Sequence, residues 1–435
     1  MKRLIQTEFN RWHASPNRKP LIIRGARQVG KTYSVVEFGK ASFETFQLFD
    51  FEKDRSLHRI FEGDLTPAQL LLELEAHCNC RIIPGKSLVF FDEIQACPRA
   101  ILSLRYFYET LPELHLIAAG SLLEFALSEI SFPVGRVEFL WMRPMLFEEF
   151  LLATKKEVLQ SALPSLQDRH PVPESIHRKL LEQLQLYFAI GGMPEAVRIY
   201  TETGSLTETA RVHESLTQAY LQDFSKYSGR MDPEIIQHVY RQLPAWIGRQ
   251  TQYSKLYPEK RTDQIKKALH ILEQTLITHR ISSSPAQGLP LGAGASDRLF
   301  KYLFLDIGLL RHLSGLSVAH ILQETELLDI FRGSLAEQFI GQELLARRSG
   351  SENERLFYWC REKPNSSAEV DFLMTEEGQI LPVEVKSGPA GKLRSLHLFL
   401  TEHPKTPYGI VLNNGNIKQF EKERLHFFPL YTRLK

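Results

Sequence analysis

The sequence predicts an α/β fold with a parallel sheet in its N-terminal third, a mainly helical middle and a second α/β region at its C-terminal end. Three observations indicate this fold. An apolar run, a glycine-rich loop and a helix-like segment follow one another over residues 21–38. A second apolar run ends in two adjacent acids at residues 92 and 93, and apolar and charged residues alternate near residues 380–388. Unbroken apolar runs are typical of buried parallel strands, and alternation is typical of half-buried strands.

Length and composition narrow the class of protein. A chain of 435 residues is too long for a single core, so about two to four domains are expected. The net charge of +2 decides neither for nor against a nucleic-acid partner. The four cysteines lack the spacing of a zinc site and are expected to be reduced thiols. No signal-peptide or membrane-spanning pattern occurs, which predicts a soluble cytoplasmic protein with no membrane partner.

The glycine-rich loop has the pattern that holds nucleotide phosphates. It reads Gly25-x-x-x-x-Gly30-Lys31-Thr32, between an expected strand and an expected helix. Glycines allow backbone N–H groups to curl around phosphates, Lys31 would reach the β- and γ-phosphates, and Thr32 would ligate Mg²⁺. The expected ligands are therefore ATP and Mg²⁺. The expected contacts in this loop are Gly25, Ala26, Arg27, Gln28, Val29, Gly30, Lys31, Thr32 and Tyr33.

The second apolar run supports the same site. Residues 88–91 read as a buried strand that closes in Asp92 and Glu93. Such acids lie at the carboxyl edge of a parallel sheet, where ligands bind. Asp92 is expected to hold Mg²⁺ through water, and Glu93 to act as the catalytic base that polarises the attacking water.

Two further strands are expected near this site, over residues 43–52 and 114–121. The second ends at Ser121, a position suited to a polar side chain that senses the γ-phosphate. Arg136 is the best candidate for an arginine finger, with a surface or ion-paired arginine as the open alternative. Arg24 and Arg27 flank the loop and are weaker candidates for phosphate contact.

The middle of the chain is expected to be helical and to include a winged helix. Apolar positions recur at intervals of three and four from about residue 148, as at Leu180, Leu184, Tyr187 and Phe188. A later helix would be capped by Thr262 or Asp263, and an extended segment with Gly and Pro follows it. The apolar face of this helix would carry Ile265, Leu269, Leu272 and Leu276. DNA phosphates would meet the basic side chains Lys255, Lys260, Arg261, Lys266 and Lys267, unless the module packs internally.

Charged residues inside two C-terminal strands suggest a second site. Asp371 lies in one apolar run, and Glu384 and Lys386 lie on one face of the next. A carboxylate and an ammonium on a covered face must pair or hold something. Residues 333–348 read as an amphipathic helix carrying Glu337, and the expected order from there is helix, three strands, helix, strand.

Several long motifs lie in order along the chain, namely RGARQVGKT, LVFFDEIQ, AAGSLLEFAL, FPVGRVEFLWMRPMLFEEF and GGMPEAV. With these motifs the chain resembles the bacterial and archaeal AAA-family ATPases that carry a C-terminal domain of unknown function. The resemblance extends from about residue 1 to the end, and it implies a C-terminal part similar to the PD-(D/E)xK nuclease fold. Gly192-Met193-Pro194 also resembles an element that faces the nucleotide in related signalling ATPases, unless it is only a helix-breaking turn.

The nuclease resemblance implies roles for four residues. Asp371, Glu384 and Lys386 match the catalytic motif, and Glu337 matches the acid of the first helix. The carboxylates Glu337, Asp371 and Glu384 would bind Mg²⁺ or Mn²⁺, and Lys386 would orient a water. Val370 replaces the proline of the motif. The alternative is an ion-paired core that cuts nothing. Phosphate contacts are expected from Arg361, Lys363, Lys392 and Arg394 in either case.

The resulting division has an AAA-type ATPase domain (1–150), a helical lid (151–228), a winged-helix-like domain (229–300) and a nuclease-like domain (301–435). Two functions remain open. In the first, ATP turnover drives binding or cleavage of DNA or RNA by the C-terminal domain. In the second, the protein is an ATP-dependent switch whose C-terminal domain only binds a partner.

Overall fold

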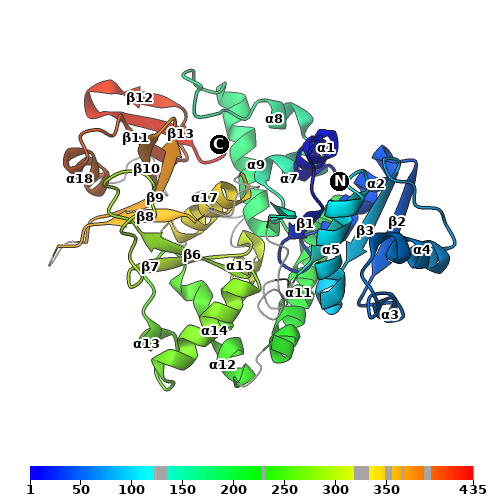
Figure 1. Cartoon of the computed structure of the whole chain (residues 1–435). Coiled ribbons are helices and arrows are strands. Elements are labelled where there is room, and N and C mark those ends of the chain that lie inside the picture. The colour runs from blue at the N-terminus through cyan, green and yellow to red at the C-terminus, as the bar shows by residue number, and fades with distance from the viewer. Residues whose placement is uncertain are drawn as a thin grey trace. The chain divides into compact units, whose positions relative to one another are not determined.

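The computed structural model describes residues 1–121, 123, 135–227, 231–317, 333–347, 355–363, 367–386 and 393–434 (Figure 1). The described chain falls into two compact units, Met1–Arg143 and the residues from Pro144 onward. Within the described residues, no helix combines the length and apolar character needed to span a membrane. The predicted division into four domains stays a prediction.

The first unit contains a five-stranded parallel sheet in the order β2-β3-β4-β1-β5 (Figure 1). The order places β4 between β1 and β3, so the carboxyl ends of these three strands are neighbours. The four strands predicted from the sequence of this unit are confirmed as β1 to β4. The strands are β1 (Leu21–Arg24), β2 (Thr45–Asp50), β3 (Ser87–Asp92), β4 (His115–Gly120) and β5 (Glu138–Trp141). The helices are α1 (Ile5–Ala14), α2 (Lys31–Ser42), α3 (Leu57–Ile60), α4 (Pro67–Cys78), η1 (Ile94–Ala96) and α5 (Pro98–Thr110).

The core of this unit explains why β3 is apolar from residue 88 to residue 91. Every residue of β3 is buried. Val89 and Phe91 belong to a cluster with residues of α4 and α5, while Phe90 stacks on Phe46 of the edge strand β2. Both faces of a central parallel strand are covered in this way, so its sequence is continuously apolar. The strand ends in Asp92, and Glu93 follows it directly.

The second unit joins many helices to an eight-stranded sheet in the order β12-β13-β11-β10-β9-β8-β6-β7. Its N-terminal helices are α7 (Phe147–Ala153), α8 (Glu157–Ser161), α9 (Glu174–Ile190), α10 (Pro194–Thr203) and α11 (Leu206–Tyr227). There follow α12 (Pro233–Gln242), η2 (Leu243–Trp246), α13 (Tyr253–Leu256), α14 (Thr262–Gln274), α15 (Ile307–Leu313), α17 (Ser334–Arg347), α18 (Arg394–Glu402) and η4 (Glu421–Glu423). The strands are β6 (Thr278–Ser283), β7 (Phe300–Phe304), β8 (Phe357–Cys360), β9 (Glu369–Glu376), β10 (Gln379–Val385), β11 (Gly409–Asn413), β12 (Lys418–Phe420) and β13 (Leu425–Pro429).

The segment expected to form a wing takes part in this large sheet. Strands β6 and β7 pair antiparallel, and β6 also pairs in parallel with β8 of the C-terminal region. The helix before them starts at Thr262, one residue earlier than a Thr262 cap predicts and two earlier than an Asp263 cap predicts. Its N-cap is Arg261, whose N–H donates to the Gln264 side chain at 3.3 Å. Leu276 lies beyond the end of that helix with a φ of 61°, so it does not extend the apolar face.

Helix α17 corrects another expectation. It was predicted to be amphipathic, yet every residue from Leu335 to Leu345 is buried. The helix contacts β7, β10 and α15, and its Phe339 ring meets the rings of Phe147 and Tyr187. A helix covered on all sides needs no polar face. Its glutamates are therefore buried charges that require partners.

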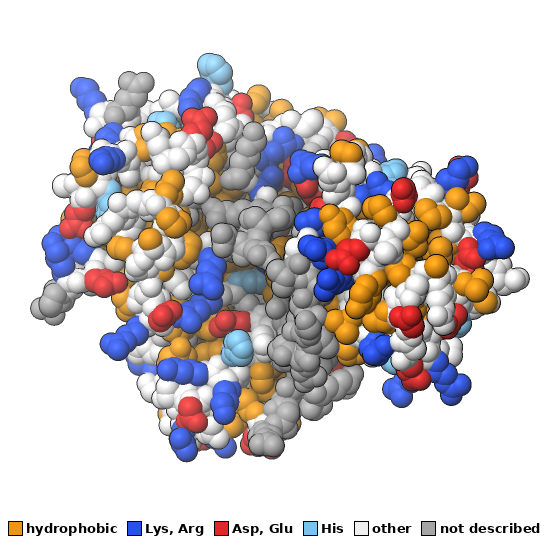
Figure 2. All heavy atoms as spheres, in the orientation of Figure 1, with side chains coloured by type: hydrophobic (Ala, Val, Ile, Leu, Met, Phe, Trp, Pro, Cys, Tyr) orange, Lys and Arg blue, Asp and Glu red, His pale blue; other side chains and the backbone are white. Residues whose placement is uncertain are grey.

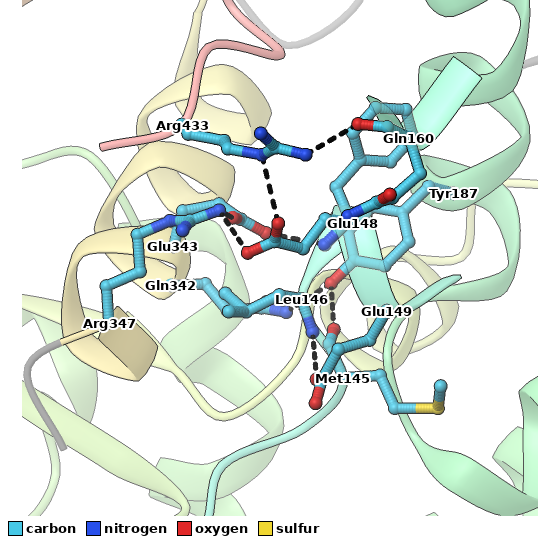
Figure 3. A network of polar contacts seen from close by, with 11 residues as sticks. Met145, Leu146, Glu148, Glu149, Gln160, Tyr187, Gln342, Glu343, Arg347 and Arg433 are labelled. Carbon is cyan, nitrogen blue, oxygen red and sulfur yellow. Dashed lines mark hydrogen bonds and ion pairs between the residues drawn. The ribbon is translucent and has the colours of Figure 1, made fainter. Parts of the chain in front are cut away.

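A buried polar network fixes one end of α17 (Figure 3). Glu148 of α7 accepts from Arg347 at 2.9 Å and from Arg433 at 3.1 Å. The carboxylate of Glu343 accepts from the N–H of Phe147 at 2.8 Å, and burial raises the pKa of Glu343 to about 7. Helix α7, helix α17 and the C-terminal segment are thus joined by ionic contacts, which hold in place the helix that carries Glu337.

Candidate functional site

The glycine-rich loop connects β1 to α2, as the sequence predicts. Gln28 and Gly30 adopt left-handed backbone angles, with φ of 65° and 93°. Gly25 lies so close to the chain after β5 that an added Cβ would be 2.3 Å from the carbonyl oxygen of Met142. Only glycine fits there. Arg3 supports the loop from outside, because its Nη1 donates to the carbonyl oxygen of Val29 at 3.0 Å.

Lys31 and Thr32 occupy the first turn of α2. The Lys31 ammonium is buried and donates to the carbonyl oxygens of Gly25 at 2.9 Å and Ala26 at 3.0 Å. Burial lowers the pKa of Lys31 to about 8, although the charges of Glu93 and Asp92 oppose this shift. The ammonium lies within the loop, where it would meet phosphate oxygens.

Thr32 contacts the acidic end of β3. Its hydroxyl donates to Oδ2 of Asp92 at 2.7 Å. Burial raises the pKa of Asp92 to about 6, and the charge of Glu93 acts in the same direction. A hydroxyl beside a carboxylate at a sheet edge is a donor set that suits Mg²⁺. The residues predicted to hold Mg²⁺ thus fit that ion.

The other residues predicted for this site have varied surroundings. Ser121 is buried directly after β4. Arg136 is exposed and pairs with Glu109 at 2.9 Å, which agrees with the alternative of a surface ion pair; its role as a finger stays a prediction. The hydroxyl of Tyr33 accepts from the N-terminal amine at 2.8 Å. The Arg24 guanidinium stacks over Phe139 at 3.8 Å, and Arg27 is half-buried.

The C-terminal motif residues come together on neighbouring strands. Asp371 lies on β9 and Glu384 on β10, and Oδ2 of Asp371 accepts from the N–H of Val385 at 2.7 Å. Oε1 of Glu384 pairs with Lys386 at 2.6 Å. Its Oε2 is buried and has no hydrogen-bond partner within the described part of the chain. The predicted order of helix, three strands, helix and strand is observed from α17 to β11.

Two further charged residues complete this cluster. Lys301 of β7 is only 1% exposed and forms ion pairs with Glu337 at 2.9 Å and with Glu369. Burial raises the pKa of both glutamates, and burial together with the charge of Asp371 raises that of Glu384. Burial would lower the pKa of Lys301, but the charges of its carboxylate neighbours outweigh this and raise it.

The charges of this cluster do not balance. Glu337, Glu369, Asp371 and Glu384 provide four carboxylates, against two ammonium groups from Lys301 and Lys386. The formal excess of two negative charges and the unpartnered Glu384 oxygen fit one divalent cation. Among the described residues, however, no group of three His, Cys, Asp or Glu is arranged to hold a metal ion. Lys301 forms direct ion pairs with Glu337 and Glu369 and acts on Asp371 and Glu384 only at longer range, so the fit is to a site with two carboxylates.

Most of the basic residues predicted to contact nucleic acid form ion pairs with acidic side chains or lie over aromatic rings. Arg361 and Lys363 pair with Glu402 at 2.6 and 3.7 Å, Arg394 is the first residue of α18, and Lys392 lies outside the described residues. Aromatic rings lie beneath Lys255, Lys260 and Lys266, and Arg261 pairs with Asp263. Figure 2 shows both basic and acidic side chains on the surface of each unit in that view. Contact with DNA by this segment stays a prediction.

The turn at Gly192-Met193-Pro194 is held inside the second unit. The N–H of Gly192 donates to Asp306 at 2.6 Å, and its carbonyl oxygen accepts from the N–H of Met145 at 2.6 Å. Asp306 is fully buried, and burial raises its pKa to about 6. Pro194 starts α10. These bonds explain the turn, and a nucleotide-facing role for it stays a prediction.

Three family models match successive parts of the chain. Residues 17–151 match an AAA domain. The part of the chain that contains this match is called the AAA domain below, after the domain it resembles. Residues 181–320 match a domain of unknown function (DUF8612), and residues 332–432 match another (DUF4143). No curated protein matches the chain.

Several solved structures are similar at low identity. The chain is 11% identical to Aeropyrum pernix ORC1 in complex with DNA, covering 72% of this chain and 93% of that one, with a TM-score of 0.33. Thermotoga maritima RuvB T158V is 12% identical, with 65% and 89% covered and a TM-score of 0.32. Aquifex aeolicus DnaA bound to AMPPCP is 13% identical, with 62% and 86% covered and a TM-score of 0.29.

Sequence reasoning missed three charged or polar residues of the two sites. Lys301 and Glu369 belong to the C-terminal cluster, and Gln95 belongs to the AAA domain, where its Nε2 donates to Oε2 of Glu93 at 2.6 Å. A signal existed for Lys301, because it interrupts the apolar run of residues 299–305 as Glu384 interrupts its own strand. Gln95 lies in the motif DEIQ, and nothing in the sequence indicates the direction of its side chain.

Proposed function

We propose that the AAA domain binds and hydrolyses ATP with Mg²⁺, and that turnover is coupled to nucleic-acid binding or metal-dependent cleavage by the C-terminal region. The contact between Thr32 and Asp92 carries the first half of the proposal, because it brings the phosphate loop and the acidic strand end into one site. Two motifs separated by about sixty residues in the sequence meet there, as nucleotide hydrolysis requires.

Each residue of the AAA site has a definite role in this proposal. Lys31 binds the β- and γ-phosphates, and the loop N–H groups hold their oxygens. When bound, Mg²⁺ neutralises part of the phosphate charge, and Thr32 and Asp92 are its protein partners. Glu93 accepts the proton of the attacking water. Ser121 contacts the γ-phosphate, and Arg136 serves as the finger.

A Lys31→Ala variant is expected to lower ATP turnover by at least about 100-fold, because it removes the positive charge that stabilises the phosphates in the transition state. Phosphate release would be measured under saturating ATP and Mg²⁺. Lys40→Ala is the matched control, since Lys40 is an exposed lysine at the other end of the same helix. Unchanged turnover in Lys31→Ala would show that this loop does not bind the phosphates of ATP.

The unpartnered Glu384 oxygen supports the second half of the proposal. Asp371 and Glu384 supply carboxylate oxygens to a divalent cation. When bound there, the cation lowers the pKa of a coordinated water and offsets phosphate charge. Lys386 remains paired with Glu384 and orients the water. Arg361 and Lys363 contact the nucleic-acid backbone.

An Asp371→Asn variant is expected to lose Mn²⁺ affinity by about 100-fold or more, since a direct ligand matters at least as much as the outer residues whose loss costs about 10- to 100-fold. Asparagine can still accept from the N–H of Val385, so the strands stay together. Mn²⁺ binding would be measured by calorimetry. Cleavage of labelled single-stranded, duplex and branched DNA and RNA would be followed with and without ATP. Asp297→Asn, on an exposed loop, is the control.

A non-catalytic C-terminal region is the second candidate. The specific observation in its favour is Lys301, whose single ammonium already pairs with both Glu337 and Glu369 and leaves two carboxylates of the cluster for a metal. In that case the protein is an ATP-dependent switch that binds a partner through this region. A wild-type protein that hydrolyses ATP but neither binds Mn²⁺ nor cuts any substrate would favour the switch.

A further inference from the structure

The backbone turn after β3 is unusual at Glu93. This residue has φ of 48° and ψ of 43°, which is left-handed and uncommon for a residue with a side chain. The turn leads into the short helix η1 and folds the chain back on itself. Strained backbone of this kind is often retained where a side chain must be held in one orientation. Here it brings Gln95 back against the carboxylate of Glu93.

The chemistry of the contact fixes the orientation of the Gln95 amide. A carboxylate only accepts hydrogen bonds, so the NH₂ group must face Glu93, to which it donates at 2.6 Å. The amide oxygen therefore points away from Glu93. This Oε1 is buried and has no hydrogen-bond partner among the residues that the structure describes. Burial of an unsatisfied acceptor is unfavourable, so its packing must be compensated elsewhere.

The amide oxygen packs against the end of β4. An added Cβ on Gly120 would lie 2.1 Å from Oε1 of Gln95 and 3.0 Å from Cγ of Leu123. Gly120 is the last residue of β4, and Ser121 follows it. Gln95 therefore spans the distance from the carboxylate of Glu93 to the strand end where Ser121 is expected to sense the γ-phosphate.

We propose that Gln95 is a positioning residue for ATP hydrolysis, which orients the Glu93 carboxylate and ties that orientation to the end of β4 at Gly120. This inference rests on the proposed ATPase function of the same site and adds the residue that aligns its base. Gln95 does not take the proton itself. It restricts Glu93 to the rotamer in which one oxygen is held by the amide and the other is left for the water.

A Gln95→Ala variant is expected to lower kcat by on the order of 10- to 100-fold, because a misplaced catalytic group loses rate of that order. The dissociation constant for a fluorescent ATP analogue should stay within about threefold, since Gln95 is not among the phosphate-binding residues. Gln95→Met tests the hydrogen bond separately from packing, because methionine fills a similar volume without donating. The kcat of Gln95→Met should fall by as much as that of Gln95→Ala. Wild-type kcat in Gln95→Met would reduce Gln95 to a packing residue and overturn the proposal.

The exposed pair of Gln69 and Glu73 on α4 is a matched control. Nε2 of Gln69 donates to Glu73 at 3.0 Å, so Gln69→Ala removes the same kind of bond elsewhere in the domain. Its kcat should remain at the wild-type value. A fall equal to that of Gln95→Ala would mean that the effect is not specific to Glu93.

Gly120→Ala provides an independent test through the other end of the amide. Its methyl group must displace the flexible end of Gln95, so kcat should fall as in Gln95→Ala. In the double variant, where no amide remains to be displaced, Gly120→Ala should add little further loss. Such non-additivity is the sign of a shared action. Additive losses would show that the two residues act separately and would overturn the link to β4.

The failure of this inference is distinguishable from the failure of the ATPase proposal. If Lys31→Ala abolishes turnover while Gln95→Ala and Gln95→Met hydrolyse ATP at the wild-type rate, the ATPase proposal is supported and the proposed role of Gln95 is wrong. If the wild-type protein itself shows no turnover that depends on Lys31, the ATPase proposal fails and the role of Gln95 fails with it.

Discussion

A Glu93→Gln variant is expected to bind ATP as tightly as the wild-type protein and to hydrolyse it about 100- to 10,000-fold more slowly, the range that general base catalysis contributes. Glutamine has nearly the same size and shape as glutamate, and its amide oxygen can still accept from Gln95. It cannot take a proton from water. The contact between Thr32 and Asp92 is untouched by the change, so the phosphate loop should keep its form.

The measurement combines phosphate release at saturating ATP with a binding titration. Glu73→Gln is the matched control, because Glu73 also accepts from a glutamine amide but lies on the exposed face of α4. That variant should keep the wild-type values of both kcat and the dissociation constant. If ATP affinity of Glu93→Gln collapsed together with turnover, Glu93 would support the loop structurally. If turnover were unchanged, the base would be another group.

The AAA site was largely predictable because its motifs are local in sequence. Gly30 and Lys31 are adjacent, Asp92 directly ends an apolar strand, and parallel strands place such ends on one edge of a sheet. The contact between Thr32 and Asp92 then follows from the fold class. Gln95 could not be placed in the same way. Its direction depends on the left-handed backbone of Glu93 and on the space left by Gly120, and neither has a sequence signal.

The C-terminal cluster was predictable only in part. Asp371 and Glu384 were recognised because each interrupts an apolar strand, and they do lie on paired strands. The partner of Glu337 was not recognised, because Glu337 is on helix α17 and Lys301 is on the earlier strand β7, and the two elements meet only in the folded structure. The burial of α17 on all sides was missed for a similar reason, since a helix with glutamates and glutamines reads as half-exposed until their tertiary partners are known.

A Lys301→Met variant is expected to destabilise the second unit by about 3–5 kcal/mol, the usual result of removing one partner from a buried ion pair. Lys301 is 1% exposed, and its ammonium lies between Glu337 and Glu369. Methionine fills most of the space of the lysine stem, so the loss measures the charge more than the packing. Without the ammonium, two carboxylates remain next to Asp371 with less compensation.

Urea denaturation followed by circular dichroism would measure this loss, and Lys363→Met is the control. Lys363 also contacts a carboxylate, Glu402 at 3.7 Å, but it is 64% exposed and its pair should contribute less than about 1 kcal/mol. The double variant Lys301→Met/Glu337→Gln should recover part of the lost stability, because it removes one uncompensated charge. If Lys301→Met lost as little unfolding free energy as Lys363→Met, the result would contradict the role of Lys301 as a buried counterion.

The pH dependence of the Lys301→Met variant gives the sharper test. Burial already raises the pKa of Glu337 and Glu369, and loss of Lys301 should raise both further. A carboxyl group whose pKa is higher in the folded state than in the unfolded state destabilises the fold in full at pH values above its folded-state pKa. The penalty decreases as pH falls below that value, and it is gone at the unfolded-state pKa, where the group is protonated in both states. The deficit of the variant should therefore be largest near pH 8 and shrink toward pH 5. A deficit that is independent of pH would arise from lost packing. One that grows on acidification would mean that Lys301 is not the counterion of these glutamates, and that the excess negative charge we assign to a divalent cation has been miscounted.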